Sequence, residues 1–207
     1  MTLEDLLDTD ELRAFERAGG AFWRQHHPLA VGEGHVAWWA DKVLCGRRGE
    51  VVPVVLRGQG ELLLHTKTSY PPGLYRLPSG GVLWGERVID ALHREVFEET
   101  GFRTFQERFL GLLTYDFQAG GRSAPFASYV FLIAGATGQP TVQDESESIS
   151  GFRWLAVSQI ATIAAELRSV AEDEPGRRDW GCFRALVHDF VAQNETFIEE
   201  MAKPCTF

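Results

Sequence analysis

The chain has 207 residues, of which 44% are hydrophobic and 24% are charged, and its formal net charge is −9. This composition is typical of a globular protein with one good core and an appendage, and the acidic balance gives no general attraction to DNA or to an anionic membrane. No apolar run approaches the roughly 20 residues that a membrane-spanning helix needs. We therefore expect no DNA-scaffold role and no membrane association.

The cysteines indicate a reducing compartment. Cys45, Cys182 and Cys205 are widely spaced, and no Cys-x-x-Cys pair is present. An odd and sparse set favours free thiols over a disulfide framework or a zinc site. The first residues are acidic and polar and do not resemble a signal peptide. We therefore expect a cytoplasmic location.

The first 45 residues are predicted to be mainly helical. The patterns favour helices over residues 3–8 and 10–26, although Gly19-Gly20 weakens the middle of the second stretch. Residues 32–41 carry no clear signal. We therefore interpret residues 1–45 as a helical N-terminal extension.

Two short strands are expected after this extension. Residues 51–57 and 61–66 are rich in aliphatic side chains, and they flank the turn sequence Gly58-Gln59-Gly60. This arrangement predicts a β-hairpin. Residues 69–85 are rich in proline and glycine, so we expect a loop there.

The remainder of the chain alternates helices with strands. The expected elements, in chain order, are a helix over 87–100, strands over 107–117 and 126–134 around Ala119-Gly120-Gly121, a strand over 151–155, a helix from 157 to about 172, a break at Pro175-Gly176 and a helix over 180–201. This order favours a sheet packed between helices, an α/β fold. We place the main domain at residues 46–172 and expect residues 173–207 to form a C-terminal helix packed on it.

Residues 80–102 carry the chemistry of the chain. They read Gly80-x5-Glu86-x7-Arg94-Glu95-Val96-x-Glu98-Glu99-x-Gly101-Phe102. Val88, Leu92 and Val96 recur at the helical period, which predicts a helix with one buried stripe. Gly101 follows as a helix stop, because glycine tolerates a left-handed backbone.

The acids on this helix are crowded at an unfavourable place. Glu95 and Glu99 lie one turn apart, and such like-charged pairs repel by about 0.2–0.5 kcal/mol. With Glu98, they also lie near the negative end of the helix dipole, which costs an anion about 0.3–1 kcal/mol. A hard divalent cation with oxygen ligands would relieve these costs together. The alternative is a solvated acidic helix face, but such faces usually interleave cations one turn away.

This pattern resembles the signature of the Nudix hydrolase family at every fixed position. The preceding Leu77-Pro78-Ser79-Gly80-Gly81 is similar to the family's Leu-Pro-Gly-Gly lead-in, with Ser79 as a departure. The resemblance covers roughly residues 50–160. It implies an α/β/α sandwich with a mixed curved sheet, to which this chain adds N- and C-terminal helices. It also implies that the protein hydrolyses a phosphoanhydride bond in a small nucleotide-derived substrate, a nucleoside diphosphate linked to another moiety. Similar proteins are often dimers, so a homodimer is expected as well.

The resemblance and the spacing together suggest roles for the fixed residues. Glu95 and Glu99 are the first candidates for direct ligands of Mg²⁺ or Mn²⁺, Glu98 is the next, and Glu86 could bind a second ion. Arg94 is expected to pair with one of these glutamates and hold its rotamer. Hydrolysis would need the metal to offset the charge of the diphosphate and to activate water.

The sequence leaves two candidate positions for the general base, one in the motif and one on a later loop. Related enzymes use either a glutamate of the motif, here Glu95 or Glu98, or an acid on a distant loop. Glu145 and Glu147 lie in the acidic segment 144–148, where such a loop would be, although a solvated loop is the more common explanation of such a segment.

Two glycines of the motif are interpreted as backbone requirements. Gly80 would allow a tight loop close to the metal, and Gly101 would end the helix. The sequence identifies no substrate-binding residue, and spacing along the chain assigns no metal-ligand role to His65 or His93.

Two other classes of function compete with the enzyme. One is a non-catalytic Nudix-fold module that binds a nucleotide as a sensor or regulator. The other is a scaffold whose terminal helices bind another protein. The complete carboxylate set favours the enzyme, because a pure binder has little need of four costly glutamates.

Overall fold

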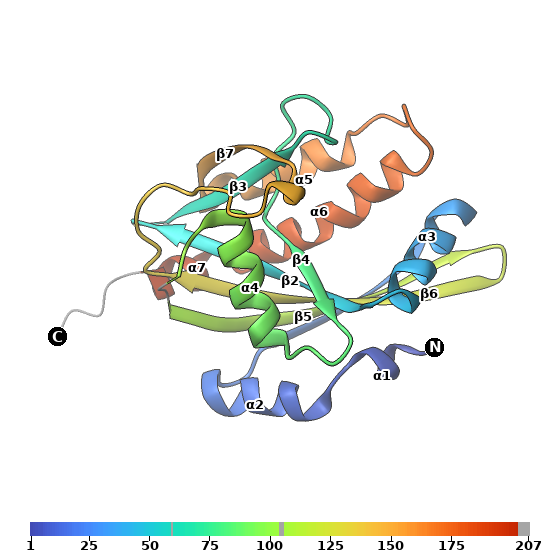
Figure 1. Ribbon diagram of the computed structural model, residues 1–207, viewed down its shortest axis with the longest axis horizontal. Helices are drawn as coiled ribbons and strands as arrows, with labels where there is room; N and C mark the ends of the chain where they lie inside the picture. The colour runs from blue at the N-terminus through green and yellow to red at the C-terminus, as the bar shows by residue number, and fades with distance from the viewer. Residues whose placement is uncertain (59, 104–105, 203–207) are drawn as a thin grey trace.

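The fold is a mixed sheet covered by helices on both faces (Figure 1). The computed structural model describes residues 1–58, 60–103 and 106–202, so Gln59 of the expected hairpin turn and Cys205 lie outside the described residues. Seven strands form the sheet in the order β1-β5-β6-β2-β3-β7, and β4 pairs with β2 beside this path. The pairs β1–β5 and β2–β6 are parallel, whereas β5–β6, β2–β3, β2–β4 and β3–β7 are antiparallel.

The described strands are β1 Trp23–Ala30, β2 Arg47–Arg57, β3 Glu61–Lys67, β4 Gly80–Leu83, β5 Gln106–Ala119, β6 Arg122–Ala134 and β7 Ile149–Ala156. The helices are α1 Leu3–Leu6, α2 Thr9–Gly19, α3 Glu33–Leu44, α4 Val88–Thr100, α5 Ile160–Arg168, α6 Arg177–Gln193 and α7 Glu195–Ala202. Two short 3₁₀ turns, η1 Glu145–Glu147 and η2 Val157–Gln159, flank β7.

The two faces of the sheet bury separate hydrophobic clusters. Successive side chains of a strand point to opposite faces. Along β2, Val52 and Val54 therefore pack in the cluster that includes α3, α5 and α6, whereas Val51 and Val55 pack in the cluster that includes α2 and α4. This arrangement confirms the predicted α/β/α sandwich with a mixed sheet.

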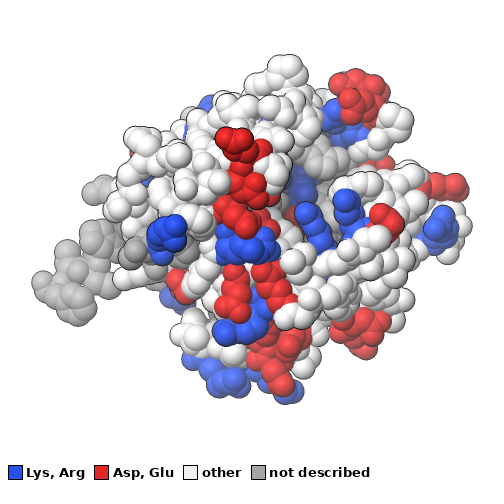
Figure 2. Space-filling view, in the orientation of Figure 1, with Lys and Arg blue, Asp and Glu red and all other residues white. Residues whose placement is uncertain are grey.

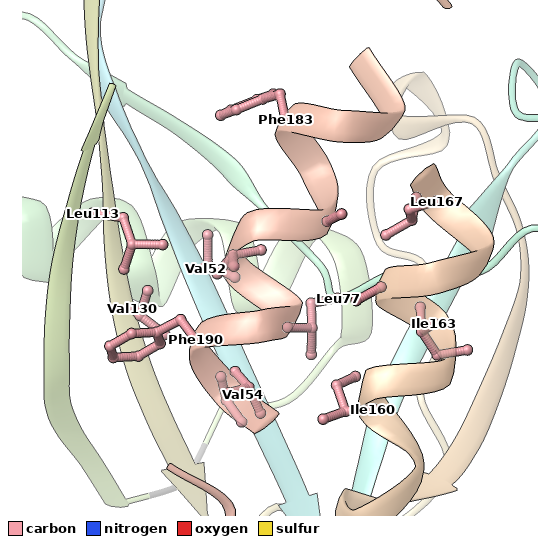
Figure 3. Packing of buried hydrophobic residues seen from close by; sticks show 14 of the residues in the cluster. Val52, Val54, Leu77, Leu113, Val130, Ile160, Ile163, Leu167, Phe183 and Phe190 are labelled. Carbon is pink, nitrogen blue, oxygen red and sulfur yellow. The ribbon is translucent and has the colours of Figure 1, made fainter. Parts of the chain in front are cut away.

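The cluster under α5 and α6 fixes these helices to the sheet (Figure 3). Phe183 and Phe190 of α6 are at most 2% exposed. Phe190 lies near Val130 and Val54, whereas Phe183, farther along α6, packs edge-on against the ring of Tyr115 on β5. Burial of a large apolar side chain contributes roughly 1.5–3 kcal/mol. The C-terminal helix is thus part of the core of the fold.

The predicted helix over residues 10–26 is wrong beyond Gly19. Gly20 has a φ of +82° and ends α2, and β1 follows from Trp23, paired in parallel with β5. The interpretation of residues 1–45 as a helical extension therefore fails at 23–30, which add a strand to the sheet. Exposure alternates along β1, as expected for a strand with one face covered.

Three further segments differ from the expectation. Residues 33–41, for which no element was predicted, lie in α3. The expected loop 69–85 contains β4, and the single helix over 180–201 is divided at Asn194 into α6 and α7. The Asn194 side chain donates to the carbonyl of Phe190 at 2.8 Å, which competes with helix continuation. In the described ranges, no helix combines the length and the apolar character needed to cross a membrane.

Candidate active site

Helix α4 carries the acids of the motif at the edge of a buried stripe. Val88, Leu92 and Val96 are fully buried against the sheet, as the spacing predicts. Gly101 ends the helix in the left-handed conformation, with a φ of +75°. A Cβ at Gly101 would also approach the carbonyl oxygen of Thr141 to 3.0 Å, so both conformation and space require glycine here.

The start of α4 is held by the N-terminal segment. Glu11 of α2 accepts a 2.7 Å hydrogen bond from the backbone N–H of Val88, which is one of the free donors at the helix start. Its other carboxylate oxygen pairs with Arg48 at 2.5 Å, and Arg48 donates to the carbonyl of Glu86 at 2.9 Å. No local sequence pattern predicts this contact, because α2 and α4 come together only in the folded chain.

Arg94 binds three glutamates of the motif. Its guanidinium contacts both carboxylate oxygens of Glu86 at 2.9 and 3.0 Å, Glu95 at 2.7 Å and Glu98 at 3.0 Å, and it donates to the carbonyl of Gly81 at 2.8 Å. Although burial opposes the shift, the hydrogen bonds from Arg94 and from a backbone N–H lower the pKa of Glu86. The expected pairing of Arg94 with one glutamate therefore extends to three.

Gly80 is required because Glu95 fills the space beside it. A Cβ at Gly80 would lie 1.8 Å from the carboxyl carbon of Glu95. Glu95 is 6% exposed, and burial raises the pKa of its carboxyl group despite the contact with Arg94. The requirement at Gly80 is for space and not for a left-handed backbone.

Glu99 is the most deeply buried acid of the site. It is 1% exposed, and burial raises the pKa of its carboxyl group to about 8, against the opposing effects of Lys67 and Arg76. Among the described residues, its Oε1 atom has no hydrogen-bond partner. That atom lies 3.2 Å from the ammonium of Lys67 and 3.8 Å from Nδ1 of His65.

His65 is a buried neighbour of the acids that the sequence reasoning missed. It lies on β3 and is fully buried, and burial lowers the pKa of its imidazole well below the usual value. Neither ring nitrogen has a hydrogen-bond partner within the described ranges. His65 therefore places a neutral polar ring beside Glu99, in a contact that no spacing along the chain could indicate.

The loop that precedes β7 brings Glu147 to the motif. In this loop, the backbone N–H of Thr141 donates to the carbonyl of Thr100 at 2.8 Å, and that of Gln143 donates to the carbonyl of Glu98 at 2.9 Å. These bonds cap the end of α4. The Glu147 carboxylate forms an ion pair with the ammonium of Lys67 at 2.5 Å. Glu145, two residues earlier, is exposed. Of the two loop candidates, the structure joins only Glu147 to the carboxylate cluster through a described ion pair.

These residues have the chemistry that a hard cation requires. Within the described ranges, no three His, Cys, Asp or Glu side chains already converge in a metal-ligand arrangement, and Arg94 and Lys67 lie between the acids. The buried and unsatisfied Oε1 of Glu99, with Glu95 and Glu147 near it, supplies the oxygen donors that Mg²⁺ and Mn²⁺ prefer. Figure 2 shows acidic side chains gathered over α4, with Lys and Arg side chains in the hollow beside them.

A cavity of about 470 Å³ lies at the other end of α4. It is lined by residues of α1 and α2 and by Arg48, Trp84, Gly85, Glu86 and Arg87. Since α4 rises about 1.5 Å per residue, this cavity is far from Glu99 at the last turn. Among the fixed positions of the motif that the structure describes, Glu86 alone contributes to its lining.

The comparisons with known proteins agree with the motif. The sequence model of the NUDIX domain matches residues 46–174, which is more than half of the chain. The chain is 32% identical over 133 residues to the NAD-capped RNA hydrolase NudC of Haemophilus influenzae, an alignment that covers 63% of this chain and 46% of that protein. It is 27% identical over 118 residues to the phosphatase NudJ of Escherichia coli, covering 57% of this chain and 74% of that one.

A solved structure is also similar. The MutT NUDIX hydrolase of Burkholderia pseudomallei matches with a TM-score of 0.43 and 22% identity, over 67% of this chain and 96% of that one. The chain spans about half the length of the NudC proteins that it matches. The family match, and the complete motif on α4, show that the chain belongs to the NUDIX domain family.

Proposed function

We propose that this protein is a divalent-metal-dependent hydrolase that cleaves a phosphoanhydride bond in a nucleoside diphosphate linked to another moiety. The observation that carries the proposal is the buried end of α4, where Glu99 presents an unsatisfied oxygen beside Glu95 and the loop acid Glu147. Burial of Glu95 and Glu99 carries a desolvation cost, and groups of acids with raised pKa values occur mostly at functional sites, which supports a role in binding or catalysis. The names of two curated relatives, an NAD-capped RNA hydrolase and a phosphatase, support hydrolysis as the type of reaction.

Glu95 and Glu99 would hold a Mg²⁺ or Mn²⁺ ion. Glu98 would be a further ligand, and Glu86 could bind a second ion. A bound ion supplies charge neutralisation at the diphosphate and activation of water. Arg94 fixes the carboxylates of Glu86, Glu95 and Glu98 through its hydrogen bonds, so that these rotamers are set before a ligand binds. Electrostatic stabilisation of this kind is most effective when the groups are preorganised.

We assign the general base to Glu147. Its Oε2 atom lies at the carboxylate cluster, on a loop that is hydrogen-bonded to the end of α4, so it could accept a proton from the attacking water. Glu98 is the alternative within the motif, because its carboxylate is half-buried and is held by Arg94. Glu145 is the weaker loop candidate because it is exposed.

A screen of nucleoside diphosphate derivatives with Mg²⁺ and Mn²⁺ tests this function. The wild type should turn over at least one compound, and Glu99→Gln should lower kcat/KM by about a hundredfold or more. Glu16→Gln, which neutralises an exposed acid on α2, is the matched control and should leave turnover unchanged. Tight binding without turnover, for every compound and both metals, would instead support the nucleotide-sensing module. A cytoplasmic location and a homodimer remain predictions that this screen does not address.

A further inference from the structure

Lys67 lies between Glu99 and Glu147, two acids from different parts of the chain. It is the last residue of β3, and its ammonium lies 3.2 Å from Glu99 on α4 and 2.5 Å from Glu147 on η1. The Lys67 side chain is only 16% exposed. Lysine is rarely buried unless it is paired, so this position is set by the two carboxylates.

Arg94 and Lys67 form ion pairs with different acids of the site. Arg94 contacts Glu86, Glu95 and Glu98, and Lys67 contacts Glu99 and Glu147. Among the described residues, Glu99 Oε1 has no hydrogen bond, so the nearby ammonium is its main electrostatic compensation. Lys67 therefore supplies positive charge beside Glu99 at this end of α4.

We infer that Lys67 is an internal counter-ion that competes with the divalent cation for Glu99, while it also holds the carboxylate of Glu147. The inference rests on the metal site of the proposed function. An ammonium and a divalent ion that both lie within about 3 Å of the same carboxylate oxygen repel each other, so each weakens the binding of the other. Metal binding would therefore favour withdrawal of Lys67 from Glu99, and its flexible four-carbon stem permits that movement. Lys67 thus positions Glu147 and lowers the affinity of the site for metal.

The test is the affinity for Mn²⁺ without any substrate, measured by electron paramagnetic resonance at one fixed alkaline pH. Lys67→Met keeps most of the side-chain volume and removes the charge, so the variant should bind Mn²⁺ about tenfold more tightly than the wild type. Lys42→Met makes the same change in net charge on α3, where the Lys42 ammonium lies over the ring of Trp38. This control should bind Mn²⁺ with the affinity of the wild type.

Two more variants keep the inference testable if Lys67→Met fails to fold. Lys67→Gln should also tighten Mn²⁺ binding, whereas Lys67→Arg keeps the charge and should remain within about threefold of the wild type. Equal or weaker affinity in both neutral variants, or no Mn²⁺ binding by any of these proteins, would overturn the inference. Because no substrate is present, a protein that binds Mn²⁺ but hydrolyses nothing would refute the proposed function alone.

Discussion

Nε2 of His188, on α6, accepts a 3.0 Å hydrogen bond from the backbone N–H of Leu77, at the start of the motif's lead-in. The same imidazole donates from Nδ1 to the carbonyl of Arg184 at 2.8 Å, since the bond to Leu77 leaves the proton on Nδ1. His188 is fully buried, and burial lowers the pKa of its imidazole to about 3. The C-terminal helix therefore fixes the loop that leads to Gly80 through a neutral histidine.

This histidine should make the fold sensitive to acid. Its pKa in the folded protein lies below the unfolded value of about 6.5, so the unfolded chain binds more protons between these values. The stabilisation is complete above pH 6.5 and is lost as the pH falls towards 3, by up to about 1.4 kcal/mol per pH unit. Urea unfolding across this range should show a shallower pH dependence in His188→Gln than in the wild type. Parallel curves would contradict the assignment.

Gly80→Ala should damage the site more than the fold. The new Cβ would collide with the Glu95 carboxylate, which must leave its position between Gly80 and Arg94. We expect a loss of stability of about 1–3 kcal/mol and weaker Mn²⁺ binding by about tenfold or more, measured by thermal unfolding and by metal titration. Gly34→Ala on α3 is the matched control, since a Cβ there meets nothing within 4 Å. Normal Mn²⁺ affinity in Gly80→Ala would show that the Glu95 position is not needed.

The contact of Glu11 with Val88 should stabilise α4 from a distant part of the chain. Glu11→Ala removes both the acceptor for the Val88 N–H and the partner of Arg48, so it should cost about 2–3 kcal/mol of unfolding free energy. Glu11→Gln keeps a carbonyl acceptor and should cost less. Glu16→Ala, on the exposed face of the same helix, should change stability by no more than about 0.5 kcal/mol. The idea fails if Glu11→Ala and Glu16→Ala unfold at the same urea concentration.

Neutralising the most buried acid should not destabilise the metal-free protein. The pKa of Glu99 in the folded state, about 8, lies above its unfolded value, so the folded chain loses stability as the pH rises from about 4.5 to 8. Glu99→Gln cannot ionise and should be at least as stable as the wild type at neutral pH without metal. Glu95→Gln should behave similarly, because burial also raises the pKa of Glu95. A clear fall in melting temperature for both variants would show that these acids serve the fold.

The sequence predicted those parts of the site that one helix brings together. Glu95, Glu98, Glu99 and Arg94 share the face of α4 by their spacing alone, and Gly101 marks the end of that helix. The position of Glu147 was open, because a loop acid gains its place only when the loop binds the end of α4. His65 and Lys67 could not be assigned, since their contact with Glu99 depends on how β3 lies against α4.

The same reasoning explains the errors in the fold. Local patterns located the long strands β2, β5 and β6, whose aliphatic runs are continuous. They missed β1, because its alternation follows directly after a helix and contains Pro28, and they missed β4, which has four residues and two glycines. Pairing with β5 and β2 makes these segments strands, and pairing is a tertiary property.

The central claim, that the acids of α4 hold a divalent cation, is tested most directly by titrating Mn²⁺ into the metal-free wild type and into Glu99→Gln. The account predicts that the wild type binds Mn²⁺ and that Glu99→Gln binds it at least about tenfold more weakly, while Glu16→Gln matches the wild type. Equal affinity in all three proteins, or no bound Mn²⁺ even with a nucleoside diphosphate compound present, would contradict it.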